Sequence, residues 1–194
     1  MQPVNGDRLL QYVDSQGYAV FENGLYNLNI IGIRTPDDNA NTFNDRLCVV
    51  YRDEWGWLTR SWAITTDPGM YWRENPGNVD GTAILVPGQY RSAYKIGKHR
   101  GKYPALVQTG AAVQVWRDDN RDAVLDQGKA RDGYFGINIH RASKRGSETV
   151  DKWSAGCQVF GDPDDYECFM DIVDRAAEIW GPRFTYTLID NPGF

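Results

Sequence analysis

Two residues whose side chains can catalyse acyl transfer occur within a short stretch of the second half of the sequence. His140 ends the segment Tyr-Phe-Gly-Ile-Asn-Ile-His, and Cys157 follows it by seventeen residues, inside Trp-Ser-Ala-Gly-Cys-Gln. An imidazole beside a thiol can take its proton and turn the sulfur into a nucleophile. The pair therefore indicates a cysteine enzyme with His140 as base and Cys157 as nucleophile. The alternative is a core cysteine and a strand histidine that have structural roles only.

Small residues come directly before the thiol. Ser154, Ala155 and Gly156 allow the backbone to turn tightly and to expose its N–H groups. Backbone N–H groups in such a turn can stabilise the oxyanion of a tetrahedral intermediate. We therefore expect the N–H groups of Gly156 and Cys157 to form an oxyanion hole.

The proposed base is expected on a strand over residues 134–141. Successive side chains of a strand point to opposite faces, and here one face is apolar. The other face carries Tyr134, Gly136, Asn138 and His140. Such a strand would hold the imidazole rigidly and present it to a polar surface.

The order of these residues resembles the catalytic signature of the L,D-transpeptidases, the cysteine enzymes of bacterial peptidoglycan. That family has a His near a strand end, then Ser/Thr-His-Gly-Cys followed by Arg or Asn. The corresponding stretch here is Ser154-Ala155-Gly156-Cys157-Gln158. The resemblance is specific over residues 134–160 and extends to 82–160, where Val-Pro-Gly-Gln-Tyr is similar to the family's strand and turn before the site.

The resemblance implies a β-sandwich with the cysteine in a cleft, the histidine as base and a backbone carbonyl that orients the imidazole. It also implies attack on a peptidoglycan stem peptide, at the bond after the diamino acid, through a thioester. Water or an amine then resolves the thioester, so hydrolysis and L,D-transpeptidation both stay open. No cofactor takes part in this chemistry.

Two positions depart from the family pattern. Ala155 stands where the family usually has a second His, and Gln158 stands where it has a substrate-contacting Arg or Asn. The residues expected to contact the substrate here are Tyr134, Asn138, Arg141, Gln158 and Arg91. Arg141, which follows the base, is a candidate to bind the substrate carboxylate instead of the missing residue.

Two further groups of side chains suggest binding. Oxygen ligands at Asp118, Asn120, Asp122 and Asp126 have the spacing of the start of a calcium loop. However, Ala123 replaces the glycine of such a loop and Lys129 its final glutamate, which favours a solvated acidic turn. His99 lies among Lys95, Lys98, Arg100 and Lys102, which favours a solvated basic loop; the alternative is a positive rim that attracts a substrate carboxylate.

The remaining cysteines are expected to be inert. Cys48 lies in an apolar strand, and Cys168 is placed on the apolar face of a late helix. In such settings a cysteine behaves as a small hydrophobic residue.

Short strands dominate the predicted elements. We expect strands over 27–34, 157–160 and 183–189, a strand over 82–90 that is broken by Pro87-Gly88, and two short strands around Gly110 within 105–117. We also expect a hairpin over 46–66 that turns near Asp53 and Glu54, a short helix over 7–16, and one late helix that follows the acids of 162–165 and ends before Gly181. This pattern predicts one mainly β domain over 1–194, of sandwich or barrel type. Residues 82–160 would be its catalytic core and 1–66 an N-terminal extension packed on the same fold.

Composition limits the partners. The 194 residues carry a net charge of −5 and 41% hydrophobic side chains, which fits a globular domain and disfavours binding to nucleic acid. No stretch approaches the ~20 apolar residues of a membrane span, and no signal peptide is visible. We therefore expect synthesis in the cytoplasm and action at the cell wall or in the periplasm. A phage-type lysis enzyme reconciles the two.

Two other classes of protein are alternatives to this enzyme. A non-catalytic cell-wall or virion-binding module would keep the fold without turnover, as Ala155 and Gln158 suggest. A papain-like protease has its cysteine before its histidine and at the start of a long helix, unlike this chain. The oligomeric state is left open.

Overall fold

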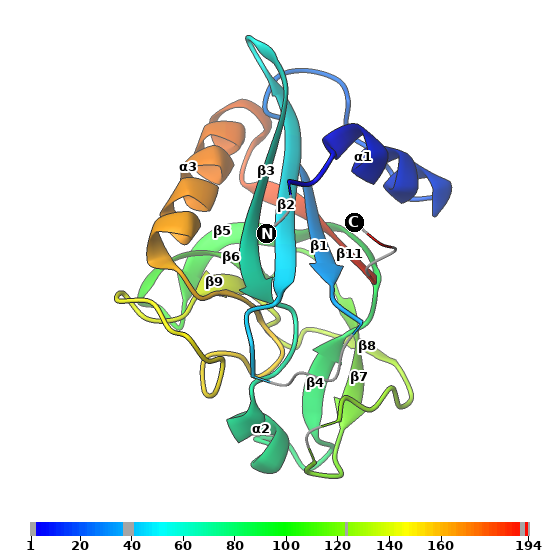
Figure 1. Cartoon of the computed structure of the whole chain (residues 1–194), viewed down its shortest axis with the longest axis vertical. Helices are drawn as coiled ribbons and strands as arrows, with labels where there is room; N and C mark the ends of the chain where they lie inside the picture. Colours follow the sequence, from blue (N-terminus) through cyan, green and yellow to red (C-terminus); the bar gives the residue numbers. More distant parts are fainter. Residues whose placement is uncertain (1–2, 37–40, 123, 191–192, 194) are drawn as a thin grey trace.

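Eight strands close into a barrel in this computed structural model, and three more form a small separate sheet (Figure 1). The structure describes residues 3–36, 41–122, 124–190 and 193. The barrel order is β1-β11-β5-β6-β9-β10-β3-β2, and the small sheet has the order β4-β7-β8. In Figure 1 the small sheet and α2 form the lower part of the molecule, and α1 and α3 flank the upper part.

The bounds of the elements are as follows. The barrel strands are β1 (Asn29–Arg34), β2 (Asp45–Asp53), β3 (Gly56–Thr65), β5 (Gly88–His99), β6 (Tyr103–Gln108), β9 (Ile139–Arg141), β10 (Gln158–Phe160) and β11 (Arg183–Asp190). The small sheet contains β4 (Thr82–Leu85), β7 (Val113–Asp118) and β8 (Arg131–Gly133). The helices are α1 (Gly6–Ser15), α2 (Met70–Glu74) and α3 (Pro163–Trp180).

Strand β2 is apolar on both faces because each face packs in a different core. Leu47 and Val49 belong to the main core, whereas Cys48 and Val50 pack in a second core beneath α1. Helix α1 contributes Leu9, Leu10 and Val13 to that second core. The alternation of a strand with period two thus explains a continuous apolar sequence.

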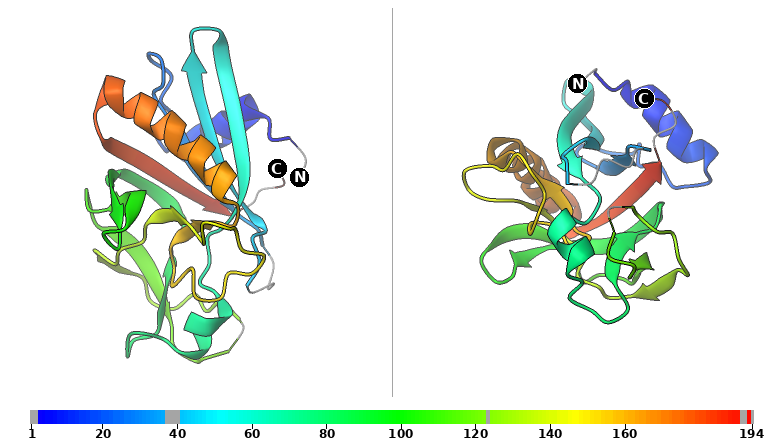
Figure 2. Two further views of the ribbon diagram at one scale, coloured as in Figure 1. Left: turned by 90° about the vertical axis from the view of Figure 1, so that its left-hand side faces the viewer. Right: turned by 60° about the horizontal axis from the view of Figure 1, so that its bottom comes forward.

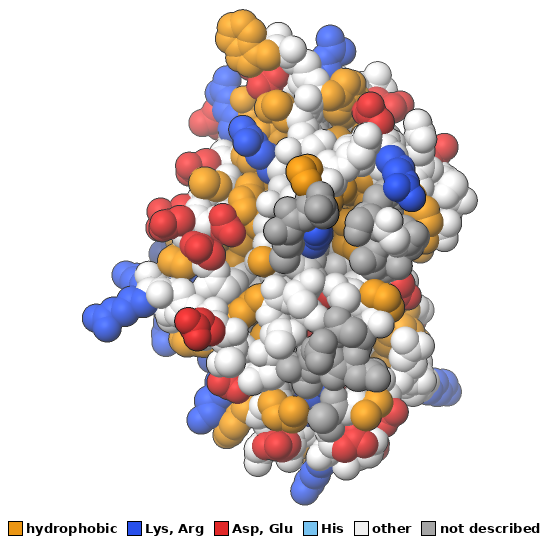
Figure 3. Space-filling view, viewed as in Figure 1, with side chains coloured by type: hydrophobic (Ala, Val, Ile, Leu, Met, Phe, Trp, Pro, Cys, Tyr) orange, Lys and Arg blue, Asp and Glu red, His pale blue; other side chains and the backbone are white. Residues whose placement is uncertain are grey.

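Helix α3 covers the opposite side of the barrel, as Figure 2 shows. Asp162 caps its first turn, because its carboxylate accepts hydrogen bonds from the N–H groups of Asp164 and Asp165. Its buried face packs in the main core through residues such as Phe169 and Val173. The acidic side chains of its outer face gather at the left of Figure 3.

The mainly β class is confirmed, as are the hairpin over 46–66, the helix at 7–16 and the late helix. The L,D-transpeptidase-like arrangement stays a prediction. Residues 1–66 were expected as an extension, and they supply β1, β2 and β3 to the barrel itself.

The strand predicted over 134–141 is wrong except for Ile139–Arg141. Gly136 has φ 70°, which lies in the left-handed region and ends the extended backbone there. The sequence also gave no signal for α2 or β8. None of the described helices has both the length and the apolar content needed to cross a membrane.

Candidate active site

Adjacent strands bring the predicted base and nucleophile to one side of the barrel wall. Strands β9 and β10 run parallel, with Ile139 opposite Gln158 and His140 opposite Val159. Cys157 directly precedes β10, and extending the strand geometry by one residue would put it on the same face as His140, with the two Cα atoms about 8 Å apart on a diagonal.

A backbone carbonyl fixes the tautomer of His140. Its Nδ1 lies 2.8 Å from the carbonyl oxygen of Arg141, which can only accept a hydrogen bond. Nδ1 therefore carries the hydrogen, and the Nε2 of the neutral ring keeps its lone pair. The Tyr103 hydroxyl donates to the same carbonyl at 2.9 Å. Nε2 is buried and forms no hydrogen bond with any described residue.

The His140 imidazole is buried rather than presented to a polar surface, so that expectation is wrong. Only 2% of the residue is exposed, and the His99 ring stacks on it with the centroids 3.8 Å apart. Burial, followed by the neighbouring His99, lowers the pKa of His140 to about 3. Burial and the charges of Arg100 and Lys102 lower the pKa of His99 to about 4. Both rings are therefore neutral at pH 7.

The Cys157 thiol is half-buried between two backbone groups. Its Sγ accepts a hydrogen bond from the Asn138 N–H at 3.4 Å and donates one to the Gly136 carbonyl at 3.4 Å. Burial raises its pKa to about 11, although the Asn138 N–H and the Arg100 charge act in the opposite direction. The resting thiol is thus protonated. Its hydrogen must turn from Gly136 toward His140 before His140 can accept it.

The turn before the thiol is held by one hydroxyl group. Ser154 Oγ donates to the Cys157 carbonyl at 2.8 Å and accepts from the Gly156 N–H at 3.1 Å. The Gly156 N–H is therefore engaged, which corrects its predicted part in an oxyanion hole. The Cys157 N–H forms no hydrogen bond with the described residues and stays available for that role.

Asn138, expected to contact the substrate, is half-buried and bonds to two other residues of the site. Its Oδ1 accepts a hydrogen bond from the Gln108 N–H at 2.9 Å. This contact orients the amide so that Nδ2, 3.2 Å from His99 Nδ1, donates to that nitrogen. Both ends of the amide are engaged, so the structure gives Asn138 a positioning role.

Two other predicted contact residues lie away from the cluster. Gln158 is fully buried, and its Oε1 accepts a hydrogen bond from Tyr186 at 2.7 Å, so it cannot reach a substrate. Arg91 lies 5.6 Å from the centre of the Phe21 ring, on another part of the barrel, and does not share the cleft. Arg141 stays beside the base, with its guanidinium 4.3 Å from the centre of the Tyr103 ring.

A cleft of about 360 Å³ lies beside the small sheet, and neither Cys157 nor His140 is among the described residues that line it. Ala83 of β4, Arg117 of β7, Tyr134, Phe135 and Ala155 are among the residues that line it. Ala155 precedes Gly156 in the chain, and Gly156 lies against the Ala83 carbonyl, so the cleft borders the turn before Cys157. Of the predicted contact residues, the exposed Tyr134 is the one in its wall.

Sequence reasoning missed His99, Tyr103 and Gln108 as parts of this cluster. His99 ends β5 and is half-buried, so its assignment to a solvated loop is wrong. The sequence feature that could have indicated His99 is that the chain has only two histidines, of which the other is the proposed base. Gln108 is buried and bonds to the N–H groups of Phe135 and Gly136 at 2.9 Å each, a role that no sequence pattern announces.

The other two cysteines differ in setting. Cys48 is fully buried, as predicted, and burial raises the pKa of its thiol to about 12. Cys168 is exposed, so its placement on the apolar face of the late helix is wrong. The helix turns Phe169 and Met170 toward the core instead.

The acidic loop at 118–126 is closed by its own amide. Asn120 Nδ2 donates to carboxylate oxygens of Asp122 and Asp126, at 2.9 and 2.5 Å, and Asp118 is buried. Ala123 lies outside the described residues. Within the part of the chain that the structure describes, no three His, Cys, Asp or Glu residues are grouped to hold a metal ion.

No protein-family model matches the chain, and comparisons with curated proteins and with solved structures also found no match.

Proposed function

We propose that this chain is a cysteine enzyme that acts on peptidoglycan stem peptides through a thioester acyl-enzyme. The observation that carries the proposal is the fixed tautomer of His140. Its Nδ1–H is bonded to the Arg141 carbonyl, and its Nε2 has no partner among the described residues. The Cys157 sulfur contacts the N–H of Asn138, two residues before His140. A buried nitrogen without a hydrogen-bond partner lowers the stability of a fold, and such groups are often explained by a catalytic role. Accepting a proton from the thiol would be such a role for Nε2.

The reaction would begin when a bound peptide approaches the sulfur. The Cys157 proton passes to His140 Nε2 while Sγ bonds to the carbonyl carbon, and the Cys157 N–H donates to the oxyanion. The intermediate collapses by breaking the C–N bond, and the departing amine takes the proton from Nε2. Water or a second amine then loses a proton to Nε2 and attacks the thioester, and breakage of the C–S bond restores the thiol.

The resting thiol is neutral, so activation must accompany substrate binding. This differs from a thiolate–imidazolium pair, which would need the two pKa values in the reverse order. Hydrogen bonds in a free enzyme are often long and tighten in the complex with substrate. The action of the enzyme would be at the cell wall, as a phage-type lysis enzyme or a transpeptidase.

The test is digestion of purified peptidoglycan, with identification of the products by mass. Hydrolysis adds water at new termini, whereas transpeptidation creates new cross-links. We expect activity in the wild type and in Cys168→Ala, no activity in Cys157→Ala, and a loss of about 10²–10⁴-fold in His140→Gln. Product release by Cys157→Ala would overturn the proposal.

The second candidate is a non-catalytic cell-wall or virion-binding module. The raised pKa of the Cys157 thiol and its lack of a hydrogen bond to His140 favour this alternative. Such a module would bind peptidoglycan equally well as wild type and as Cys157→Ala, and neither would release products.

A further inference from the structure

Among the described residues, one charged side chain lines the cleft that borders the turn before the thiol. Arg117 is that residue, and the other described side chains in the wall of the cleft are neutral. The chain as a whole is acidic, with a net charge of −5, so a cleft whose charge is a single cation differs from the rest of the molecule.

Three contacts hold Arg117 in place. Strand β7 pairs with β4, which sets Arg117 opposite Ala83. Its Nη1 donates to the Gly81 carbonyl at 2.9 Å, and its guanidinium carbon lies 5.1 Å from the centre of the Phe135 ring. The planar group is thus oriented before any ligand arrives.

The hydrogen-bonding capacity of this guanidinium is incompletely used. Nε is buried without a partner, and Arg117 forms no ion pair with any described residue. The neighbouring Asp80 is paired with Arg131 instead, at 2.5 Å. Burial lowers the pKa of Arg117. A guanidinium remains charged in such a setting and gains most from an anion with two oxygens.

We infer that Arg117 binds a carboxylate of the peptide substrate and thereby sets which carbonyl reaches Cys157. The inference rests on the proposed function. A peptide that lies in the cleft with its carboxylate on Arg117 extends past Phe135 and Ala155 toward the thiol. This contact would supply the carboxylate recognition that Gln158, buried in the barrel, cannot provide.

The experiment measures peptide binding to Cys157→Ser protein, which cannot turn over. Three tetrapeptide stems are titrated by calorimetry: one with free carboxylates, one with an amidated C-terminus and one with an amidated side-chain carboxylate on the diamino acid. The same titrations use Arg117→Gln and Arg117→Lys in that background. Arg131→Gln is the matched control, since it removes a nearby exposed cation that is not in the cleft. Circular dichroism and thermal unfolding establish that each variant is folded.

We expect Arg117→Gln to weaken binding of the free-carboxylate peptide by roughly tenfold or more, because a charge-assisted hydrogen bond is lost. Arg117→Lys should be intermediate, and Arg131→Gln unchanged. Amidation of the carboxylate that Arg117 binds should weaken binding to the parent and leave Arg117→Gln unaffected. Equal binding by folded parent and Arg117→Gln would overturn this inference and leave the proposed function standing. No binding of any peptide by any variant would overturn the proposed function, and this inference with it.

Discussion

Burial, together with the stacking of two imidazoles, sets the protonation state of His140 at the candidate site. His99 and His140 cannot both carry a proton at 3.8 Å without repulsion, and Arg100 and Arg141 add further positive charge. His99 is itself oriented by Asn138, whose N–H also reaches the Cys157 sulfur. The neighbouring residues therefore keep the His140 imidazole neutral, with Nε2 unprotonated.

This arrangement predicts unusual acid tolerance of the reaction. A base works only when unprotonated, and a pKa of about 3 leaves His140 unprotonated well below the ordinary value of 6.5. We expect kcat/KM to stay level from pH 7 to pH 5, measured by release of products from peptidoglycan. His99→Ala removes the ring that stacks on His140 and exposes His140 further, which should raise the pKa of the base. The pH at which kcat/KM of this variant falls on the acid side should therefore be higher than in the wild type. A wild-type acid limb near pH 6.5 would contradict the assignment.

At the scale of elements, two glycines next to the thiol provide a matched pair. Both have positive φ, 115° at Gly156 and 70° at Gly136. A Cβ on Gly156 would lie 2.3 Å from the Ala83 carbonyl oxygen, whereas one on Gly136 would meet no atom within 4 Å. Replacement of Gly136 therefore tests strain alone, and replacement of Gly156 tests strain together with a clash against the backbone of β4.

We expect Gly136→Ala to lower the free energy of unfolding by about 1–2 kcal/mol, the cost of a left-handed residue with a side chain. Gly156→Ala should lower it by more and abolish activity, because β4 must move away from the turn that carries Cys157. Denaturant unfolding of the two variants measures the difference. Equal losses would show that the turn and β4 are not in contact.

The elements with regular patterns were predictable, and the connections at the site were not. A charged turn between β-branched and aromatic runs located the β2–β3 hairpin, and the acids of 162–165 followed by apolar residues at helical spacing located α3. Residues 134–138 have a strand-like composition, but Gly136 bends them and Gln108 holds the bend. Local periodicity cannot report hydrogen bonds to a residue on another strand.

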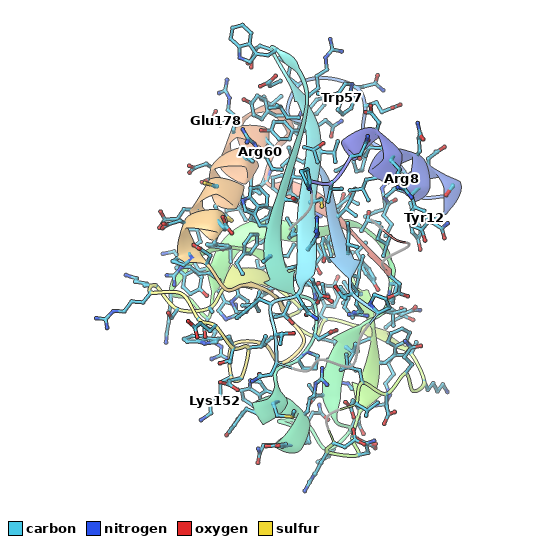
Figure 4. The ribbon with its side chains drawn as sticks, in the orientation of Figure 1. Arg8, Tyr12, Trp57, Arg60, Lys152 and Glu178 are labelled. Atoms are coloured by element: carbon cyan, nitrogen blue, oxygen red, sulfur yellow. The ribbon has the colours of Figure 1, made fainter. Side chains whose placement is uncertain are left out.

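At the scale of the whole molecule, barrel closure assembles the candidate site. His99, Tyr103, His140 and Cys157 come from or next to four neighbouring strands, β5, β6, β9 and β10. The sequence indicated the pair at 140 and 157, which lie on or next to strands that it predicted. It did not indicate His99, which joins the cluster only through the strand order. The contact between Lys152 and α2 lies outside this cluster. The Nζ of Lys152 is 4.2 Å from the centre of the ring of Tyr71, a residue of α2 (Figure 4).

A second buried titratable group ties strand ends together. Asp45, at the start of β2, accepts hydrogen bonds from the N–H groups of Thr35 at 2.7 Å and Thr66 at 2.6 Å. Burial, followed by the charge of Asp67, raises its pKa to about 6. Asp45 thus joins the segments that follow β1 and β3, and its titration bears on the stability of the barrel.

The two buried groups give the stability opposite pH dependences. The depressed pKa of His140 means that its contribution is present above the unfolded value of 6.5 and is lost as the pH falls toward 3. The raised pKa of Asp45 means that its folded form gains a proton below about pH 6, which favours folding as the pH falls. Between pH 7 and pH 5 the histidine destabilises the fold while the carboxyl partly compensates.

Removing each group in turn separates the two effects. Linkage predicts that His140 alone takes away about 2 kcal/mol of unfolding free energy between pH 7 and pH 5. In His140→Gln the loss over this range should shrink by about that amount. In Asp45→Asn the loss should become steeper, because the compensating proton uptake is gone, although the variant is less stable at every pH. Guanidinium unfolding at the two pH values measures each slope, and identical slopes in His140→Gln and wild type would show that the imidazole already titrates normally in the folded barrel.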